Sequence, residues 1–480
     1  MAWFSIPRPL AVLLALSLFG DAATAIELDL TSSASIKSAA STIAFDMMSY
    51  YKGNLSGQTP GLLPGPPATP SITNAGYFWW EAGAMFGSLV DYWYYTGDTT
   101  YNDVVSQALL FQTGPDNDYL PTNQTNGMGN DDQGFWGMSA MTAAELGFPD
   151  PPPDKPQWLA LAQGVYNVQA GKWDPTTCNG GLHWQAFSFL NGFTYKNSIA
   201  NGCFFNIAAR LAVYTANDSY AVSAERTWDW VRSVKFIDDA YNVYDGAQST
   251  VDNCTQVNKQ QYSYNSAIFL LGAAHMYNYT NGSQIWQGRV AGLLNATLTN
   301  FFRNGIAYEN ICEAKVSTCS IDMLSFKAYL TRWMAAATKQ APFIFDQVKG
   351  VLESSAKAAA LQCSGSPADH PNGRTCGLSW ALGAAWDGTS GVGQQMAAME
   401  VIQSNLITQA KAPLTAGSGG TSKGDPSAGS GDISTPEVVK PITTADRAGA
   451  GILTALLSAI VVSGLAWVSM AEKGVGIMKG

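Results

Sequence analysis

The feature that most constrains the fold is a chain of helical segments whose connections alternate between very short and long. Between residues 35 and 409, apolar residues recur with helical spacing in about twelve segments, and candidate strands are few. The approximate spans are 35–51, 77–96, 99–112, 133–146, 157–173, 197–215, 219–234, 260–279, 283–302, 323–338, 342–361 and 392–409. Short links rich in turn residues, such as "TGD" and "AND", predict antiparallel helical hairpins.

The links between these hairpins are long. They cover residues 52–76, 113–132, 174–196, 235–259, 303–322 and 362–391. This alternation places all the long loops at one end of the assembly, where they meet the N-termini of alternate helices. The simplest arrangement that buries the inner helices is an all-α (α/α)6 barrel, in which six hairpins form a ring and the first and twelfth helices pair. A linear solenoid is the alternative, but no fixed-period repeat favours it.

The N-terminal region predicts export. Residues 1–25 combine Arg8 with the apolar run "LAVLLALSLFG" and the small-residue end "ATA", which is the pattern of a cleaved secretory signal. Seven N-x-S/T sequons suit a secreted glycoprotein. They lie at Asn54, Asn123, Asn217, Asn253, Asn278, Asn281 and Asn295. The predicted barrel domain then spans residues 26–410.

The C-terminal region predicts a tether. Residues 411–450 are rich in Gly, Ser, Thr and Pro and lack periodicity, so we expect an extended stalk. Residues 451–480 contain an apolar run of bilayer-spanning length followed by "AEKGVGIMKG". Small residues, a spacer and an apolar tail together predict a GPI-anchor signal, and a single membrane span is the alternative. Either tether predicts a body at the cell surface.

Seven cysteines permit many pairings, and an oxidising compartment would favour disulfides. Two pairs can each close one long loop, and a third pair can join two loops of the same face. These pairs are Cys312 with Cys319, Cys363 with Cys376, and Cys178 with Cys254. Cys203 lies within an apolar helix and is expected to be a buried free thiol.

Two adjacent aspartates, Asp131 and Asp132, stand at the start of the fourth predicted helix on the long-loop face. The simple interpretation is that one of them caps the helix, whose N-terminus favours negative charge. However, "GMGN" before them would allow close approach, and Phe135 and Trp136 offer apolar surface. A retaining glycoside hydrolase needs two carboxyl groups about 5 Å apart, one as nucleophile and one as proton donor. The pair therefore predicts glycoside hydrolysis, with coupled titration of the two groups.

Other polar and aromatic residues fall on the same predicted rim. For each one alone, a capping or core-edge role is at least as good an explanation as contact with a ligand. Their shared position at one end of the barrel favours a cleft for a neutral glycan, because aromatic faces pack on sugars while amides and carboxylates bind hydroxyls. The predicted substrate-binding residues are Trp80, Asn197, Asp245, Asn265 and Lys327.

Several function classes are disfavoured. The formal net charge is 26 minus 36, or -10, without a long basic run, which argues against nucleic acid as a partner. The histidines, His183, His275 and His370, lie far apart without metal-ligand spacing, although a Ca²⁺ site built from loop aspartates stays open. The sequence has no Walker loop, dinucleotide fingerprint or GxSxG elbow. We therefore predict no metal and no cofactor.

The chain also resembles a known family. The matching stretches are "YFWWEAGAMFGSLVDYWYYTGD", "GNDDQGFWGMSAMTAAELGF", "WDPTTCNGGLHWQ", "YKNSIANGCFFNIAARLAVYT", "QYSYNSAIFLLGA" and "LSFKAYLTRW". They resemble glycoside hydrolase family 76, and in particular its fungal GPI-anchored cell-wall members, the mannan endo-1,6-α-mannosidases. The resemblance covers nearly all of residues 27–410 and implies an (α/α)6 barrel and retaining cleavage of α-1,6-linked mannose. It implies that Asp131 is the nucleophile and Asp132 the general acid/base.

The resemblance also implies partners and a location. These are α-1,6-mannan or the GPI-core glycan as substrate, wall glucan as a possible acceptor, and attachment to the plasma membrane and cell wall. Hydrolysis and transglycosylation share one intermediate, so both stay open. Two further hypotheses are a non-catalytic mannan-binding wall protein and an (α/α)6 glycosidase for another polysaccharide. An inverting enzyme would need carboxyl groups roughly 6.5–9.5 Å apart.

Overall fold

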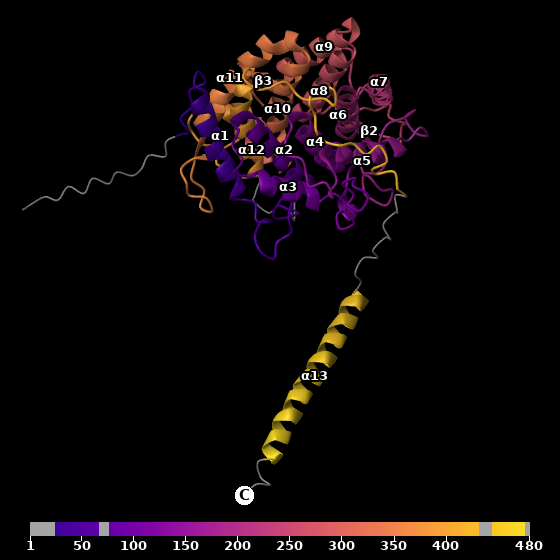
Figure 1. Cartoon of the computed structure of the whole chain (residues 1–480), viewed down its shortest axis with the longest axis vertical. Helices are drawn as coiled ribbons and strands as arrows, with labels where there is room; N and C mark the ends of the chain where they lie inside the picture. Colours follow the sequence, from indigo (N-terminus) through magenta and orange to yellow (C-terminus); the bar gives the residue numbers. More distant parts are fainter. Residues whose placement is uncertain (1–24, 67–75, 432–443, 476–480) are drawn as a thin grey trace, which may run out of the picture. The chain divides into compact units, whose positions relative to one another are not determined.

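The inner part of the fold is a closed ring of helices (Figure 1). The structure is a computed structural model, and it describes residues 25–66, 76–431 and 444–475. The ring helices are α2 (Trp79–Thr96), α4 (Asn130–Leu146), α6 (Ser198–Thr215), α8 (Ser263–Tyr279), α10 (Phe326–Gln340) and α12 (Val392–Gln403). Each packs against the next one, and α12 packs against α2, which closes the ring.

A second layer of helices surrounds this ring. It consists of α1 (Ser33–Met48), α3 (Asn102–Phe111), α5 (Trp158–Gly171), α7 (Asp218–Ser233), α9 (Gln284–Phe301) and α11 (Phe345–Gln362). Each outer helix packs against a ring helix, and α1 packs against α12 as expected from the sequence. The predicted (α/α)6 barrel is thus confirmed, and an open solenoid is excluded.

The two layers differ in their sequences because their burial differs. In α4, every residue from Gln133 to Glu145 is buried, so the helix is apolar or small on all sides. In α7, by contrast, the buried residues form one face, as in a surface helix. Glycine allows the ring helices to approach closely: a Cβ at Gly134 would lie 2.5 Å from the Cβ of Cys203 on α6. The ring is therefore packed too tightly for larger side chains at such positions.

The predicted helix boundaries agree with the structure to within a few residues, except that the last ring helix ends at Gln403 rather than at 409. One difference matters for function. The fourth helix begins at Asn130, not at 133, so Asp131 and Asp132 lie inside its first turn. The helix extends further because Asp132 Oδ2 accepts a hydrogen bond from the main-chain N–H of Gly129 (2.6 Å).

The long loops gather at one end of the barrel and are tied together there. Strands β1 (Tyr195–Asn197) and β2 (Gly246–Gln248) pair antiparallel, with Lys196 opposite Ala247. The other short elements are the hairpins β3 (Phe302–Arg303) with β4 (Ile306–Ala307) and β5 (Cys363–Gly365) with β6 (Thr375–Cys376), and the 3₁₀ helices η1 (Thr125–Gly127), η2 (Glu313–Thr318), η3 (Pro342–Ile344), η4 (Trp380–Leu382) and η5 (Ser404–Leu406).

Disulfides fix these loops further. All three predicted bridges are present: Cys178–Cys254, Cys312–Cys319 and Cys363–Cys376. Cys203 is a buried free thiol, also as predicted. The bridges join or close the loops that stand over the ring, so the end that carries Asp131 and Asp132 is built from restrained segments.

Residues 411–431, in which the sequence predicts an extended stalk, lie against the outside of the barrel beside α5 (Figure 1). Main-chain N–H groups of this segment donate to the barrel: Leu414 to Glu145 O (2.6 Å), Ala416 to Tyr214 O (2.9 Å) and Gly429 to Asp116 O (2.9 Å). We name residues 411–431 the strap. The rest of the predicted stalk up to residue 443 lies outside the described residues.

The strap is rich in glycine because its backbone lies directly on the barrel. A Cβ at Gly420 would lie 2.3 Å from Tyr214 Oη, and one at Gly429 would lie 2.3 Å from the carbonyl oxygen of Gly164. A composition that usually indicates a flexible linker here permits close packing. Among the described residues, the strap accordingly belongs to the same compact unit as the barrel, beyond the predicted domain end at 410.

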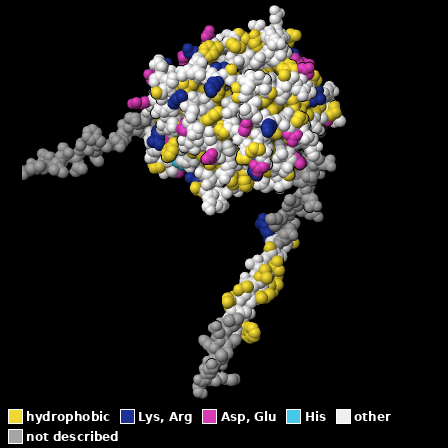
Figure 2. Space-filling model, viewed as in Figure 1, with side chains coloured by type: hydrophobic (Ala, Val, Ile, Leu, Met, Phe, Trp, Pro, Cys, Tyr) yellow, Lys and Arg dark blue, Asp and Glu magenta, His cyan; other side chains and the backbone are white. Residues whose placement is uncertain are grey.

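Helix α13 (Thr444–Val475) belongs to a separate unit. Within the described residues, it is the one helix that is long and apolar enough to cross a membrane, over Arg447–Leu465. Figure 2 shows hydrophobic side chains along it, and its large apolar residues such as Leu456 and Val462 are exposed. Both features are compatible with the predicted anchor. Residues 1–24 of the predicted signal lie outside the described residues.

Candidate active site

A cleft of about 500 Å³ opens among the long loops, at the end of the barrel where Asp131 and Asp132 begin α4. Aromatic rings form much of its wall. They are Phe78, Trp80, Phe135, Trp184, Tyr195, Tyr262, Tyr264 and Phe326. Four carboxyl groups line it, those of Asp131, Asp132, Asp245 and Asp322, and among the described residues neither Lys nor Arg does. The cleft therefore combines aromatic ring faces, on which sugars can pack, with carboxyl groups that no Lys or Arg of the lining neutralises.

Asp131 is surrounded by hydrogen-bond donors. Its Oδ1 accepts from the main-chain N–H of Asp132 (3.0 Å), and the side chains of Trp184 and Asn197 also donate to its carboxylate. Burial raises the pKa of Asp131 to about 7, and these donors limit the rise. Asn197 can fill this role because its Oδ1 caps α6 by accepting from Ala200 N–H (3.1 Å), which leaves its amide group to donate.

Asp132 has fewer donors and more negative neighbours. One main-chain N–H, that of Gly129, donates to its carboxylate. Burial raises the pKa of Asp132 well above its usual range, and the charges of Asp131 and Asp322 raise it further. Of the coupled pair, Asp131 is thus better stabilised as a carboxylate, and Asp132 keeps its proton to higher pH. The two adjacent acids are chemically unequal.

Three of the five predicted binding residues lie in the cleft. Trp80 packs on Phe135 with ring centroids 4.5 Å apart, and its side chain hydrogen-bonds Asp322. Asn197 lines the cleft beside Asp131. Asp245 accepts hydrogen bonds from Tyr195 Oη (2.6 Å) and from Asn258 Nδ2 (3.1 Å), which orient its carboxylate on the wall.

The other two, Asn265 and Lys327, are fully buried and do not line the cleft. Lys327 Nζ forms an ion pair with Glu313 (3.1 Å) and lies 3.8 Å from the centre of the Trp380 ring. Both residues occur early in ring helices at the correct end of the barrel. The rotation of each helix, which the sequence pattern left open, turns them into the protein and turns neighbours such as Tyr264 toward the cleft.

Sequence reasoning missed Asp322 and Tyr195. Asp322 lies in a long loop shortly before α10 begins at Phe326, at the same end of the barrel as Asp131 and Asp132 in the first turn of α4. The sequence could have predicted Asp322 as a site residue, because it is an acid on the long-loop side of a ring helix. Tyr195 had no such signal, because its place in β1 depends on pairing with β2.

Over the described ranges, no group of three or more His, Cys, Asp or Glu side chains is arranged to hold a metal ion. The carboxylates of the cleft are instead distributed around its wall beside aromatic rings.

Comparison with known proteins places this arrangement in a family. The sequence pattern described as "Glycosyl hydrolase family 76" matches residues 35–417, which is most of the chain. The chain belongs to glycoside hydrolase family 76. This membership confirms the resemblance that the sequence motifs carry, and it makes the chain a member of a family of glycoside hydrolases.

Similar family 76 proteins come from fungi. Mannan endo-1,6-alpha-mannosidase DCW1 of Candida glabrata is 44% identical over 444 residues, which cover 92% of this chain and 95% of the relative. Mannan endo-1,6-alpha-mannosidase DFG5 of Saccharomyces cerevisiae is 41% identical over 454 residues, covering 94% and 95% of the two chains.

Solved structures agree with the fold. The crystal structure of Dfg5 from Chaetomium thermophilum in complex with glucosamine has 48% identity and a TM-score of 0.79, and the match covers 84% of this chain and 97% of that one. An inactive variant of the α-1,6-mannanase GH76A of Salegentibacter sp. HEL1_6, in complex with α-1,6-mannotriose, has 13% identity and a TM-score of 0.60, with 78% and 99% covered. At that identity the likeness concerns the barrel fold alone.

Proposed function

We propose that this chain is an extracellular, retaining, endo-acting α-1,6-mannosidase in which Asp131 is the nucleophile and Asp132 the general acid/base. The observation that carries the proposal is the inequality of the two adjacent acids within the cleft of a family 76 barrel. The fungal relatives at 41–44% identity bear the name mannan endo-1,6-alpha-mannosidase, which supports the choice of substrate.

The geometry supports a two-step reaction. In the first step, the Asp131 carboxylate attacks the anomeric carbon, the glycosidic bond breaks, and Asp132 gives its proton to the departing oxygen. In the second step, Asp132 takes a proton from water as that water attacks the anomeric carbon and releases Asp131. Aromatic rings hold the apolar faces of the sugars, and a cleft rich in carboxylates favours the positive charge that develops on the sugar ring.

Transfer is an extension of the same chemistry. If a sugar hydroxyl replaces water in the second step, the mannosyl group passes to an acceptor instead of being hydrolysed. We propose α-1,6-mannan or a GPI-core glycan as donor and wall glucan as the possible acceptor. We also propose a location at the plasma membrane and cell wall, where the secreted chain would be held through its C-terminal apolar segment.

Turnover assays test the proposal. The parent, Asp131→Asn and Asp132→Asn are incubated with α-1,6-mannan oligosaccharides, with and without a β-glucan acceptor, and glycan binding is measured calorimetrically. We expect both variants to lose turnover at least about 10³-fold while glycan binding is retained. Parent-like turnover in Asp131→Asn would remove this residue from the chemistry, and binding without turnover in the parent would favour a mannan-binding wall protein.

A further inference from the structure

Asp322 is a carboxylate of the cleft to which the two-step reaction assigns no task. We propose that Asp322 is a positioning residue that keeps Asp132 protonated by electrostatic repulsion and so sets the alkaline limit of activity. The proposal rests on the role of Asp132 as general acid/base. Asp245, the other loop carboxylate of the cleft, has no such effect, because its charge is not among those that raise the pKa of Asp132.

The carboxylate of Asp322 is held in place from several sides. The indole N–H of Trp80 donates to it, and Ser320 Oγ lies 3.5 Å from its Oδ2. Its main-chain carbonyl accepts from Ser325 N–H (2.9 Å) and from Ser325 Oγ (2.7 Å), which anchors Asp322 to the start of α10. The charge therefore has a fixed position in the cleft.

The loop that carries Asp322 is itself restrained. It follows the Cys312–Cys319 bridge, and the preceding η2 segment contributes Glu313, the ion-pair partner of the buried Lys327. Lys327 Nζ also donates to Leu378 O (2.5 Å). A cation that sequence analysis placed in the substrate site thus serves to stabilise the loop behind Asp322, and it does not line the cleft.

The groups around Asp132 add negative charge from several elements. The titratable groups that face it or line the cleft beside it are Asp131 on α4, Glu81 on α2, Cys203 on α6, Tyr195 on β1, Tyr262 and Tyr264 at the start of α8, and Asp245 and Asp322 in the loops. Within the described residues, this set includes no cation. Asp322 is the one whose charge, after that of Asp131, most clearly raises the pKa of Asp132.

Asp322 is charged in the pH range, and in the step of the reaction, in which its charge affects Asp132. Burial raises the pKa of Asp322 to about 6, so this group is ionised above that pH, and its charge then opposes the loss of the proton from Asp132. In the covalent intermediate, Asp131 is an ester and carries no charge. Asp322 then remains to raise the proton affinity of Asp132, which strengthens Asp132 as the base of the second step.

The test is the pH profile of kcat and KM on an α-1,6-mannan oligosaccharide, measured for the full chain and for Asp322→Asn. Removing the charge should lower the pH at which Asp132 loses its proton, so the alkaline limb of the kcat profile should move to lower pH, and each unit of that move lowers kcat about tenfold at a given pH on that limb. At pH 5, where Asp322 itself is protonated, Asn imitates the neutral acid, so kcat should stay within about threefold of the parent. KM should be unchanged at both pH values.

Matched variants separate this role from others. Asp322→Glu keeps the charge and should keep the alkaline limit within about half a unit of the parent, and Asp245→Asn should raise KM without moving that limit. If Asp322→Asn does not fold, Asp322→Ser removes the same charge with a smaller side chain and must show the same shift.

Two results would overturn the inference. One is an alkaline limit that stays in place in the Asp322→Asn protein, and the other is a rise in KM of equal size at every pH, which would make Asp322 a binder of a substrate hydroxyl. A parent that does not cleave α-1,6-mannan at all would instead contradict the proposed function, so the two failures are distinguishable.

Discussion

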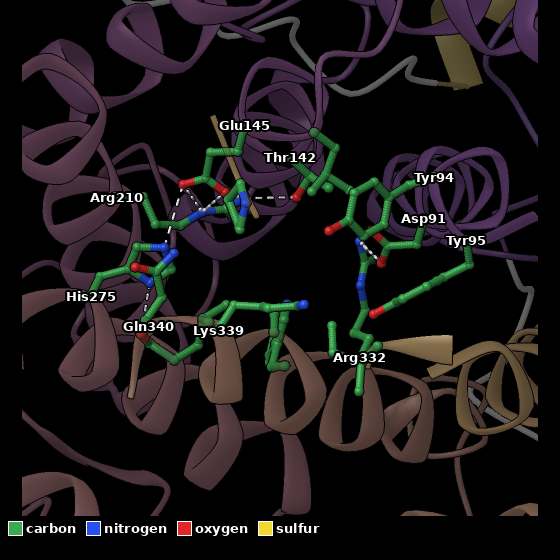
Figure 3. A pocket seen from close by; sticks show the side chains of 16 residues that line it. Asp91, Tyr94, Tyr95, Thr142, Glu145, Arg210, His275, Arg332, Lys339 and Gln340 are labelled. Atoms are coloured by element: carbon green, nitrogen blue, oxygen red, sulfur yellow. Dashed lines mark hydrogen bonds and ion pairs between the residues drawn. The ribbon is translucent and has the colours of Figure 1, made fainter. Parts of the chain in front are cut away.

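Both ends of the barrel contain buried carboxyl groups, but among the described residues those at one end are paired with cations and those that line the cleft at the other are not. At the closed end, away from the cleft, Glu145 is bound by Arg210 through two hydrogen bonds (Nε–Oε1 3.1 Å, Nη2–Oε2 2.6 Å), and His275 Nε2 lies 3.5 Å away (Figure 3). Arg332 Nη2 lies 2.8 Å from Asp91 in the same cluster. At the cleft, no Lys or Arg of the described chain lies beside Asp131 and Asp132 in this way.

The pKa values show what this difference does. Burial alone would raise the pKa of Glu145, but Arg210 and His275 more than offset this and lower it to about 2. Without a cation, burial raises the pKa of Asp131 to about 7. A cation that two acids share does not suffice: Glu400 shares Arg332 with Asp91, and burial together with the charge of Asp91 raises the pKa of Glu400 to about 8. Paired acids keep a fixed charge and serve structure, whereas unpaired acids exchange protons and can serve catalysis.

The closed end is also covered by the chain itself. Lys339 Nζ donates to Ala410 O (2.8 Å), Tyr94 Oη donates to Lys411 O, and Leu414 N–H donates to Glu145 O (2.6 Å). The strap then runs beside α5 to Asp116, in the loop that leads to the cleft. The chain thus covers part of this end, and the cluster of Glu145, Arg210 and His275 lines a small pocket there (Figure 3).

Breaking the paired end should produce the largest change in stability. Replacing Arg210 by Met leaves Glu145 buried without its cation, which should lower the free energy of unfolding by about 3–5 kcal/mol. Urea unfolding measures this, and activity per folded molecule should be retained because the cleft is untouched. The double variant Arg210→Met/Glu145→Gln is the control and should recover part of the loss. An unfolding free energy within about 1 kcal/mol of the parent in the single variant would contradict the account.

Removing the strap should have the next largest effect. A chain that ends at Ala410 loses the main-chain hydrogen bonds of Leu414, Ala416 and Gly429, and we expect a loss of about 2 kcal/mol, because each bond contributes about 0.5–1.5 kcal/mol. Thermal unfolding compares it with a chain that ends at Gly431, which should match the full barrel. Equal stability of the two truncated chains would mean that the strap is a stalk after all.

The pH dependence of stability offers a smaller but more specific contrast. Asp131 has an ordinary pKa of 3.8 that is raised to about 7, so between these values the folded chain binds more protons than the unfolded one and stability falls as pH rises. Asp131→Asn should flatten this slope. Glu145 acts in the opposite sense, because its depressed pKa stabilises the fold above pH 4.5, and this contribution is lost as pH falls toward 2.

Chemical unfolding at a series of pH values between about 5.5 and 7, above the range in which the unfolded Glu145 side chain titrates, checks this sign. Glu145→Gln serves as the control, since it should leave the slope in that window in place while it removes the loss of stability at lower pH. A slope in the Asp131→Asn variant equal to that of the parent would show that this acid is not buried without a cation as described.

Much of the fold could be predicted because it follows from the order of short and long links. That order fixed the ring, placed the long loops together and suggested the disulfides. The acid pair was visible because a helix start on the loop face is a local feature. Asn265 and Lys327 do not line the cleft, because the rotation of each helix about its own axis decides whether a given side chain faces the cleft or the core, and the sequence pattern left that rotation open.

The strap shows a different limit of sequence reasoning. Its glycines and serines look the same whether the backbone is free in solvent or packed on a neighbour, and the deciding contacts, such as Gly420 against Tyr214, are far apart in the sequence. The position of Asp322 in the cleft likewise depends on a loop that a disulfide and an ion pair hold in place. Such features arise from tertiary packing, which has no local signature.

The most direct test of the central claim, that two neighbouring acids have unlike tasks, is to trap the intermediate. Asp132→Ala is mixed with a dinitrophenyl α-1,6-mannobioside, whose good leaving group needs no acid, and peptide masses are measured with and without azide. The account predicts a glycosyl ester on Asp131 that accumulates and that azide releases. An adduct on another residue, or none while the parent cleaves the same compound, would contradict it.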